Sequence, residues 1–333
     1  MPFLATTLAA GIDSFMEIWR QRPITCLRPE QEDTRTCANR NKLTGFGGTT
    51  AMFEYDPAAP LDIVETGTFD RGGATIHDIT YASPLGGTVP AYLVVPGVAG
   101  SCWEWGWFPA IIYVHAHQET RASFLPEAIT LAPAGVISLL IDAPFLRPYY
   151  KAPDENVTPD PAAHVGEYRQ LVVDVRRGID LLTTRPDVDP ARIAYVGHGL
   201  GATLGGPLAG VEQRIRSYVL IEGLASLTDW YRTSMHPAAA RLRARFTPEQ
   251  FDRYLATLAP LDAFHDIGRA APAALFFQFA RHDKVVPVEQ AHKYYEAASE
   301  PKEIVWYDTD RSLIRLAAAS LDRVHWLARQ LAF

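Results

Sequence analysis

The sequence IAYVGHGLGATLGG, residues 193–206, combines an apolar run, a glycine-rich turn and small residues that favour the start of a helix. This order is typical of the motif Gly-x-Ser-x-Gly, in which a strained turn presents a nucleophilic serine. Here the middle position is Gly199, which has no side chain. The backbone amide of Leu200, at the expected helix start, could still bind an anion. The motif therefore predicts a nucleophile turn without its nucleophile.

Two acidic residues follow predicted strands and could take part in acid–base chemistry. Asp283 stands in ARHDKVVP, between a strand and a helix, and Glu222 ends the strand SYVLIEG. Glu222 could act as a general base if burial raises its pKa. It could equally be a carboxylate that accepts hydrogen bonds from loop amides, and the sequence leaves both alternatives open.

The stretch HAHQETRASF, residues 115–124, offers imidazole and amide groups directly after another predicted strand. His117 and Gln118 are placed to meet a ligand, and a backbone amide there could join that of Leu200 in an anion site. His115 is expected to bond to nearby backbone, as most buried polar groups do. No third ligand is evident beside His115 and His117, so we expect no metal and no cofactor.

These residues need a scaffold, and the middle of the chain alternates strand and helix patterns. Apolar residues recur at helical spacing over residues 168–182 and again over 316–331. Alternating β and α elements indicate a parallel sheet with helices on both faces, and such sheets bind ligands at their carboxyl edge. The predicted strands are residues 91–96, 110–116, 136–143, 192–197, 217–223, 273–280 and 303–308.

Three segments interrupt this alternation. Residues 1–51 form an N-terminal extension, and residues 225–272 contain two short amphipathic helices that we interpret as a small lid over the carboxyl ends of the strands. A long loop follows the strand 136–143. Its Arg147 and Tyr149 could reach a ligand, or they could belong to a solvated loop.

Over about residues 52–333 the chain resembles α/β-hydrolases of the dienelactone-hydrolase and acetyl-esterase kind. The resemblance rests on the order and spacing of DITYASPLGGTVPAYLVVP, PAIIYVHAH, DVRRGIDLLTTRPDVDPARIAYVGHGLGAT, FQFARHDKVVPVEQAHKYYEAA and KEIVWYDTDRSL. It implies the α/β-hydrolase fold, a mostly parallel twisted sheet with helices on both faces and a small helical lid. It also implies a serine, an aspartate and a histidine in that chain order as the catalytic triad.

Only one member of that triad is present. Gly199 stands where the resemblance implies the serine, Arg311 where it implies the histidine, and Asp283 at the position of the acid. The later His325 lies inside a helical pattern and is expected to be packed or half exposed there. Arg311 and Asp283 could form a salt bridge that fills the place of the histidine. Alternatively, the guanidinium of Arg311 could hold a substrate carboxylate or enolate.

Composition and charge narrow the range of partners. The 333 residues are 48% hydrophobic and 21% charged, with a net charge of −7. These values favour a small-molecule ligand over nucleic acid or an anionic membrane. Three cysteines without C-x-x-C spacing, and an opening stretch without a basic region, favour a reducing cytoplasm. The tryptophan-rich stretch 100–110 is expected to pack against residues 1–50 or a second subunit, which leaves a homo-oligomer open.

Three hypotheses of function follow. The leading one is a former hydrolase redirected to non-hydrolytic chemistry, such as cyclisation, elimination or isomerisation of a specialised metabolite. In it, Arg311, the anion site and Glu222 or His117 supply electrostatic stabilisation and proton transfer. The second is a catalytically silent ligand sensor or partner-binding protein. The third is an esterase in which Gly199 has replaced the nucleophile as a disabling substitution.

Overall fold

The structure, a computed structural model, describes residues 51–97, 107–148, 160–310 and 312–333. Two of the residues predicted to lie at the site, Arg311 and Tyr149, are outside these ranges. The same holds for almost all of the predicted N-terminal extension and for most of the tryptophan-rich stretch. In these ranges no helix is both long and apolar enough to cross a lipid bilayer.

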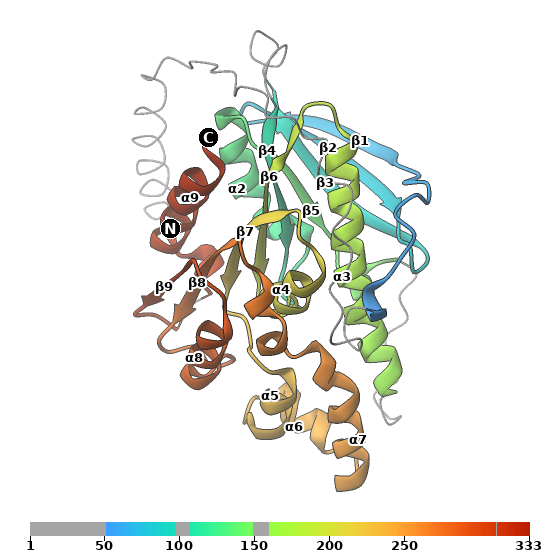
Figure 1. The fold of residues 1–333 in the computed structure, drawn as a ribbon, viewed down its shortest axis with the longest axis vertical. Coiled ribbons are helices and arrows are strands. Elements are labelled where there is room, and N and C mark those ends of the chain that lie inside the picture. Colours follow the sequence, from blue (N-terminus) through green and yellow to red (C-terminus); the bar gives the residue numbers. More distant parts are fainter. Residues whose placement is uncertain (1–50, 98–106, 149–159, 311) are drawn as a thin grey trace, which may run out of the picture.

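One nine-stranded sheet forms the centre of the molecule, in the order β1-β2-β3-β5-β4-β6-β7-β8-β9 (Figure 1). All seven predicted strands are confirmed, as β3 to β9. The first two strands were not predicted. β1 is an exposed edge strand without an apolar pattern, whereas β2 has buried residues at nearly alternate positions that the prediction did not assign to a strand. The strands are β1 (Val64–Arg71), β2 (Ala74–Ala82), β3 (Thr88–Pro96), β4 (Phe108–Val114), β5 (Ile137–Ile141), β6 (Val188–His198), β7 (Ile215–Ile221), β8 (Ala274–Ala280) and β9 (Lys302–Tyr307).

Strand direction divides the sheet into two parts. The strands β1, β2 and β3 pair antiparallel, and β3 also pairs antiparallel with β5. From β5 to β9 every pair is parallel. Since the carboxyl ends of parallel strands meet at one edge, the segments that follow β4 to β9 come together there.

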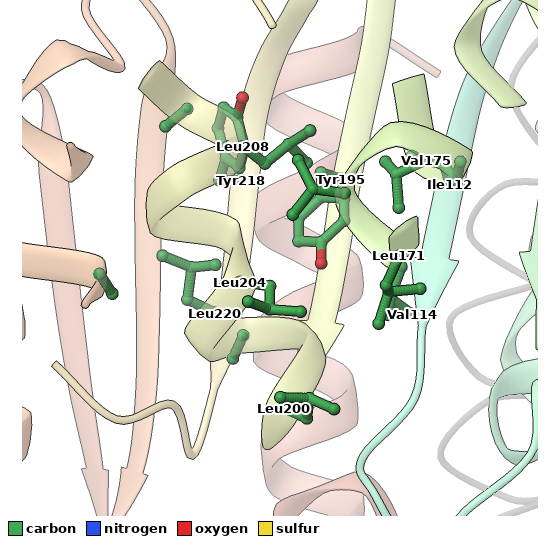
Figure 2. Packing of buried hydrophobic residues seen from close by; sticks show 14 of the residues in the cluster. Ile112, Val114, Leu171, Val175, Tyr195, Leu200, Leu204, Leu208, Tyr218 and Leu220 are labelled. Atoms are coloured by element: carbon green, nitrogen blue, oxygen red, sulfur yellow. The ribbon is translucent and has the colours of Figure 1, made fainter. Parts of the chain in front are cut away.

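Helices cover both faces of the sheet (Figure 1). One buried cluster joins one face to α3, α4 and α8, and a second joins the other face to α2 and α9. Figure 2 shows Leu204 and Leu208 of α4 beside Tyr195 of β6 and Leu220 of β7. The helices are α2 (Leu125–Leu131), α3 (Pro161–Thr184), α4 (Leu200–Val211), α5 (Leu227–Thr233), α6 (Pro237–Arg243), α7 (Pro248–Leu258), α8 (Val288–Ala297) and α9 (Ala317–Leu331).

Three short helices, α5, α6 and α7, lie between β7 and β8 in the chain, beyond the carboxyl ends of the strands (Figure 1). Local sequence explains where α7 begins. Thr247 and Gln250 form a reciprocal capping box, and Pro248 takes the first helical position, where its missing N–H costs nothing. α7 packs against the amino-terminal end of α3, the longest of these helices.

Candidate functional site

The turn between β6 and α4 has the geometry of a nucleophile elbow. Gly199 has φ +54° and its N–H donates to the Ile221 carbonyl at 2.8 Å. A Cβ atom on Gly201 would lie 2.4 Å from the Val114 carbonyl oxygen, and one on Gly197 would lie 2.5 Å from the Gly201 backbone. Glycine at these positions therefore lets α4 begin close against β4, with Leu200 as its first residue.

The space that a side chain at Gly199 would need is occupied. A Cβ atom built there would lie 2.9 Å from the Cβ of Ala116, in the loop after β4. Carbon atoms do not approach so closely without a shift of one backbone. The turn therefore has the backbone geometry of an elbow, and Ala116 lies in the space that a side chain at position 199 would need.

His198, the last residue of β6, lies between two carboxylates. Its Nδ1 is 2.8 Å from Oε2 of Glu119, and its Nε2 is 2.7 Å from Oε2 of Glu222. The side chains of His198, Glu119 and Glu222 are 8%, 16% and 9% exposed. We call these three residues the ion cluster. A histidine that donates from both ring nitrogens to carboxylates is an imidazolium.

In the ion cluster, the carboxylates stabilise the charge on His198, and the imidazolium stabilises the charge on Glu119. Burial opposes the charge on His198, but the hydrogen bonds to Glu119 and Glu222 outweigh it and raise the pKa of His198 to about 9. Burial likewise opposes the charge on Glu119, but the hydrogen bond and charge of His198, together with the Ala116 N–H and the nearby His115, outweigh it and lower the pKa of Glu119. His198 is therefore charged at neutral pH and cannot accept a proton.

The ion cluster also ties four segments of the carboxyl edge together. Glu222 follows β7 in a left-handed conformation, with φ +53°, and its Oε1 accepts from the Leu313 N–H at 3.3 Å. The hydroxyl of Ser312 lies 3.4 Å from Nε2 of His198. The predicted alternative of a carboxylate that accepts from a loop amide matches Oε1 of Glu222, while Oε2 accepts from the His198 imidazolium; the general-base alternative stays a prediction.

The two histidines after β4 differ in role. His115 is buried, its Nδ1 donates to the Ala116 carbonyl at 2.7 Å, and its Nε2 accepts from the Ala143 N–H at 3.1 Å. This is the backbone bonding that the sequence predicted. His117 and Gln118 are exposed, as a ligand contact requires, and the His117 ring lies 4.4 Å from that of Phe145. Desolvation by surrounding atoms, and then the neighbouring His115, lower the pKa of His117. Its imidazole is therefore neutral at neutral pH.

A second histidine site, not predicted from the sequence, lies where α3 meets the short helices. His164, in the first turn of α3, has its ring 4.5 Å from Tyr168 and 6.1 Å from Tyr231 of α5. Its Nδ1 is hydrogen-bonded to the hydroxyl of Tyr254 of α7. We call these four residues the aromatic cluster. Burial lowers the pKa of His164 to about 4, and the nearby His117 adds to this effect.

Asp283 lies in the loop after β8, as predicted. Its Oδ1 accepts from the N–H groups of Val285 at 2.6 Å and Val286 at 3.1 Å, which fixes the turn. This loop runs beside the one after β9, since the His282 N–H donates to the Thr309 carbonyl at 3.1 Å. The predicted partner, Arg311, lies outside the described residues, so its pairing with Asp283 stays a prediction.

Arg147 does not face a ligand. Its side chain is fully buried and pairs with Asp174 of α3 at 2.5 Å. Burial raises the pKa of Asp174, and Arg147 offsets this only in part. The prediction placed Arg147 in an open loop because its partner, which lies 27 residues away, leaves no local signal. His325 is exposed on α9, in line with the expected helix histidine.

Among the residues with assigned positions, no three His, Cys, Asp or Glu side chains are arranged to hold a metal ion. Each ring nitrogen of His198 is hydrogen-bonded to a carboxylate, so neither is available as a metal ligand.

A mostly parallel sheet, helices on both faces and an elbow between β6 and α4 define the α/β-hydrolase fold, and the chain has this fold. The acetyl xylan esterase from Paenibacillus sp. R4 is similar in structure, with a TM-score of 0.70 at 20% identity, over 85% of this chain and 92% of that one. Acetyl xylan esterase 1 from Thermoanaerobacterium sp. JW/SL YS485 gives a TM-score of 0.66 at 16% identity, over 84% and 91%.

The α/β hydrolase GrgF from Penicillium sp. sh18 is a third similar structure, with a TM-score of 0.55 at 16% identity, over 77% of this chain and 99% of that one. No protein-family model matches the sequence, and the search of curated proteins gave no significant match. At these identities the comparisons establish the fold, and the chemistry rests on the site itself.

Proposed function

We propose that the protein binds a small organic molecule above the elbow and converts it without hydrolysis, by isomerisation, elimination or cyclisation. The observation that carries this proposal is that Gly199 has no side chain and that a Cβ atom built there would lie 2.9 Å from the Cβ of Ala116. A reaction through an acyl-enzyme needs a nucleophile and an adjacent base. No nucleophile is offered at the elbow, since Gly199 has no side chain and the neighbouring His198 is an imidazolium held by two carboxylates.

His117 is the group we assign to proton transfer. It directly follows Ala116, so it lies beside the elbow, and its imidazole is exposed and neutral. A neutral imidazole accepts a proton at neutral pH and returns it later in the same reaction. Gln118 and the Leu200 amide would orient the molecule. Arg311 would add a positive charge if its side chain turns toward the ligand.

The test is conversion in H₂¹⁸O. The full chain is incubated with fractionated metabolite extracts, and mass spectrometry follows each depleted species and its product. We expect products without ¹⁸O, and no burst with 4-nitrophenyl acetate. Products that carry one ¹⁸O beyond the exchange of the same product in H₂¹⁸O without enzyme, or a stoichiometric burst, would contradict the proposal, because both indicate hydrolysis. Stable binding without any conversion would also contradict it and would favour a ligand sensor. His117→Phe should abolish conversion, with His325→Phe as the matched control.

A further inference from the structure

The antiparallel end of the sheet finishes at β1, whose outer side faces solvent. β1 is the first strand in the order of the sheet and pairs with β2 alone among the strands that the structure describes (Figure 1). All eight of its residues are exposed. An edge of this kind presents backbone N–H and C=O groups to a further strand. We propose that this further strand is β1 of a second copy, which makes the protein a symmetric dimer.

Large apolar side chains gather at this edge. Ile63 is 50% exposed, Val64 55% and Phe69 43%. They are three of the nine large hydrophobic residues that are exposed in the described part of the chain. Val64 and Phe69 lie on one face of β1, since they pair with Thr80 and Ile76, four residues apart on β2. Apolar side chains grouped on an exposed edge strand indicate a contact with another chain.

The sequence of β1 is complementary to itself about Gly67. Let Gly67 face Gly67 of an antiparallel second copy, with the bulge between Glu65 and Gly67 kept in both copies. Val64 then lies opposite Phe69, which is a favourable cross-strand pair of a β-branched and an aromatic residue. Glu65 lies opposite Thr68, whose hydroxyl already donates to that carboxylate within one chain. Each pair occurs twice, because a twofold axis repeats it.

The charges favour this register over its neighbours. Asp62, just before β1, comes opposite Arg71 of the other copy, so that opposite charges meet at both ends of the paired strands. A shift by two residues in one direction places Glu65 opposite Asp70, and in the other direction it places Glu65 opposite itself. Like charges directly opposite one another are destabilising. Charge complementarity thus favours a second copy of this chain as the partner of β1.

The contact is small, and it lies far along the sheet from the elbow. A single pair of strands buries less than the ~1,600 Å² of a standard stable interface, so we expect a dimer that dissociates on dilution. Four strands, β2, β3, β5 and β4, separate β1 from β6, which carries the elbow. Substitutions in β1 therefore test the dimer without altering the candidate site.

The experiment is sedimentation velocity of the full chain over a wide dilution series, with a charge exchange across the axis. The unchanged chain should show a monomer–dimer equilibrium. Arg71→Asp and Asp62→Arg each bring like charges together twice, and each should weaken dimerisation by about 10-fold. An equimolar mixture of these two variants pairs opposite charges again and should recover the dimer. Phe69→Thr keeps a residue that favours strands but removes the apolar contact, so it should also weaken the dimer.

Val288→Thr is the matched control, since Val288 is 39% exposed on α8, and it should leave the dimer unchanged. Hydrogen exchange with mass spectrometry tests the unchanged chain without any substitution. Peptides from β1 should exchange more slowly in the concentrated than in the dilute protein, and peptides from β9, at the other end of the sheet, should not. A monomer at every concentration, or exchange in β1 that does not depend on concentration, would overturn the proposal. A dimer that Arg71→Asp leaves intact, or that the mixture does not recover, would also overturn it.

Discussion

The ion cluster contains a buried histidine and the aromatic cluster a partly buried one, and the two differ in charge. His198 lies between Glu119 and Glu222 and has a pKa of about 9. His164 lies among tyrosine rings and has a pKa of about 4. Burial disfavours the charge in both, and only the paired carboxylates reverse it. The partners of a histidine, and not its depth, decide which proton chemistry it can do.

This difference assigns separate tasks to the two clusters. The imidazolium of His198 holds the loop after β4, the end of β7 and, through Glu222, the residue Leu313 after β9. Its protons are committed to these bonds. The neutral His164 is hydrogen-bonded at Nδ1 to Tyr254 of α7 and contacts Tyr231 of α5. One cluster joins loops at the carboxyl edge, and the other joins the start of α3 to the short helices.

The largest effect should come from removing the positive charge of the ion cluster. His198→Leu leaves the two carboxylates without their cationic partner, and we expect it to lower the free energy of unfolding at pH 7 by about 3–5 kcal/mol. Urea denaturation measures the change. The control His325→Leu, on the exposed side of α9, should stay within about 0.5 kcal/mol. A loss below about 1 kcal/mol for His198→Leu would show that the carboxylates do not depend on this charge.

The pH dependence of stability should separate the two clusters. His198 has a folded pKa above its unfolded value of about 6.5, so its contribution is complete below that pH and is lost as pH rises through about 9. This loss is on the order of 3 kcal/mol. His164 has a folded pKa below its unfolded value, so stability rises with pH between about 4 and 6.5.

Denaturant titrations at a series of pH values measure both slopes. His198→Leu should remove the loss of stability that occurs as pH rises toward about 9. His164→Phe should remove the gain in stability between about pH 4 and 6.5. If each variant keeps the slope that it is expected to lose, the charge assignment of that histidine is wrong.

A smaller effect is expected at the elbow, next to His198 in the chain. Gly199→Ala places a Cβ atom 2.9 Å from that of Ala116 and should cost about 1–3 kcal/mol. The second substitution Ala116→Gly opens the space and should recover part of the loss. Thermal unfolding of both single variants and the double variant measures the coupling. Additive losses would show that Ala116 does not close the elbow.

Local patterns were sufficient to predict the sheet and the elbow, because strands and tight turns leave signals within a few residues. The apolar runs predicted β3 to β9, and the glycines around position 199 predicted the turn. The exposed strand β1 has no such pattern, which explains why it was missed.

Both clusters escaped prediction because their partners are distant in the chain. His198 meets Glu119 across 79 residues, and His164 meets Tyr254 across 90. The residue before the nucleophile position is usually a support of the turn, so nothing in the elbow itself indicated an imidazolium. The same reason explains Arg147, whose burial depends on Asp174.

The most direct test of these charge states is the ¹⁵N NMR spectrum of the full chain with labelled histidine. The ten histidines are assigned by single substitutions, and their ring nitrogens report charge and tautomer. At pH 7.5 we expect His198 with both ring nitrogens protonated, and at pH 5.5 His164 neutral with its hydrogen on Nε2. Titration of His198 near its ordinary pKa of about 6.5, or a charged His164 at pH 5.5, would contradict the assignment.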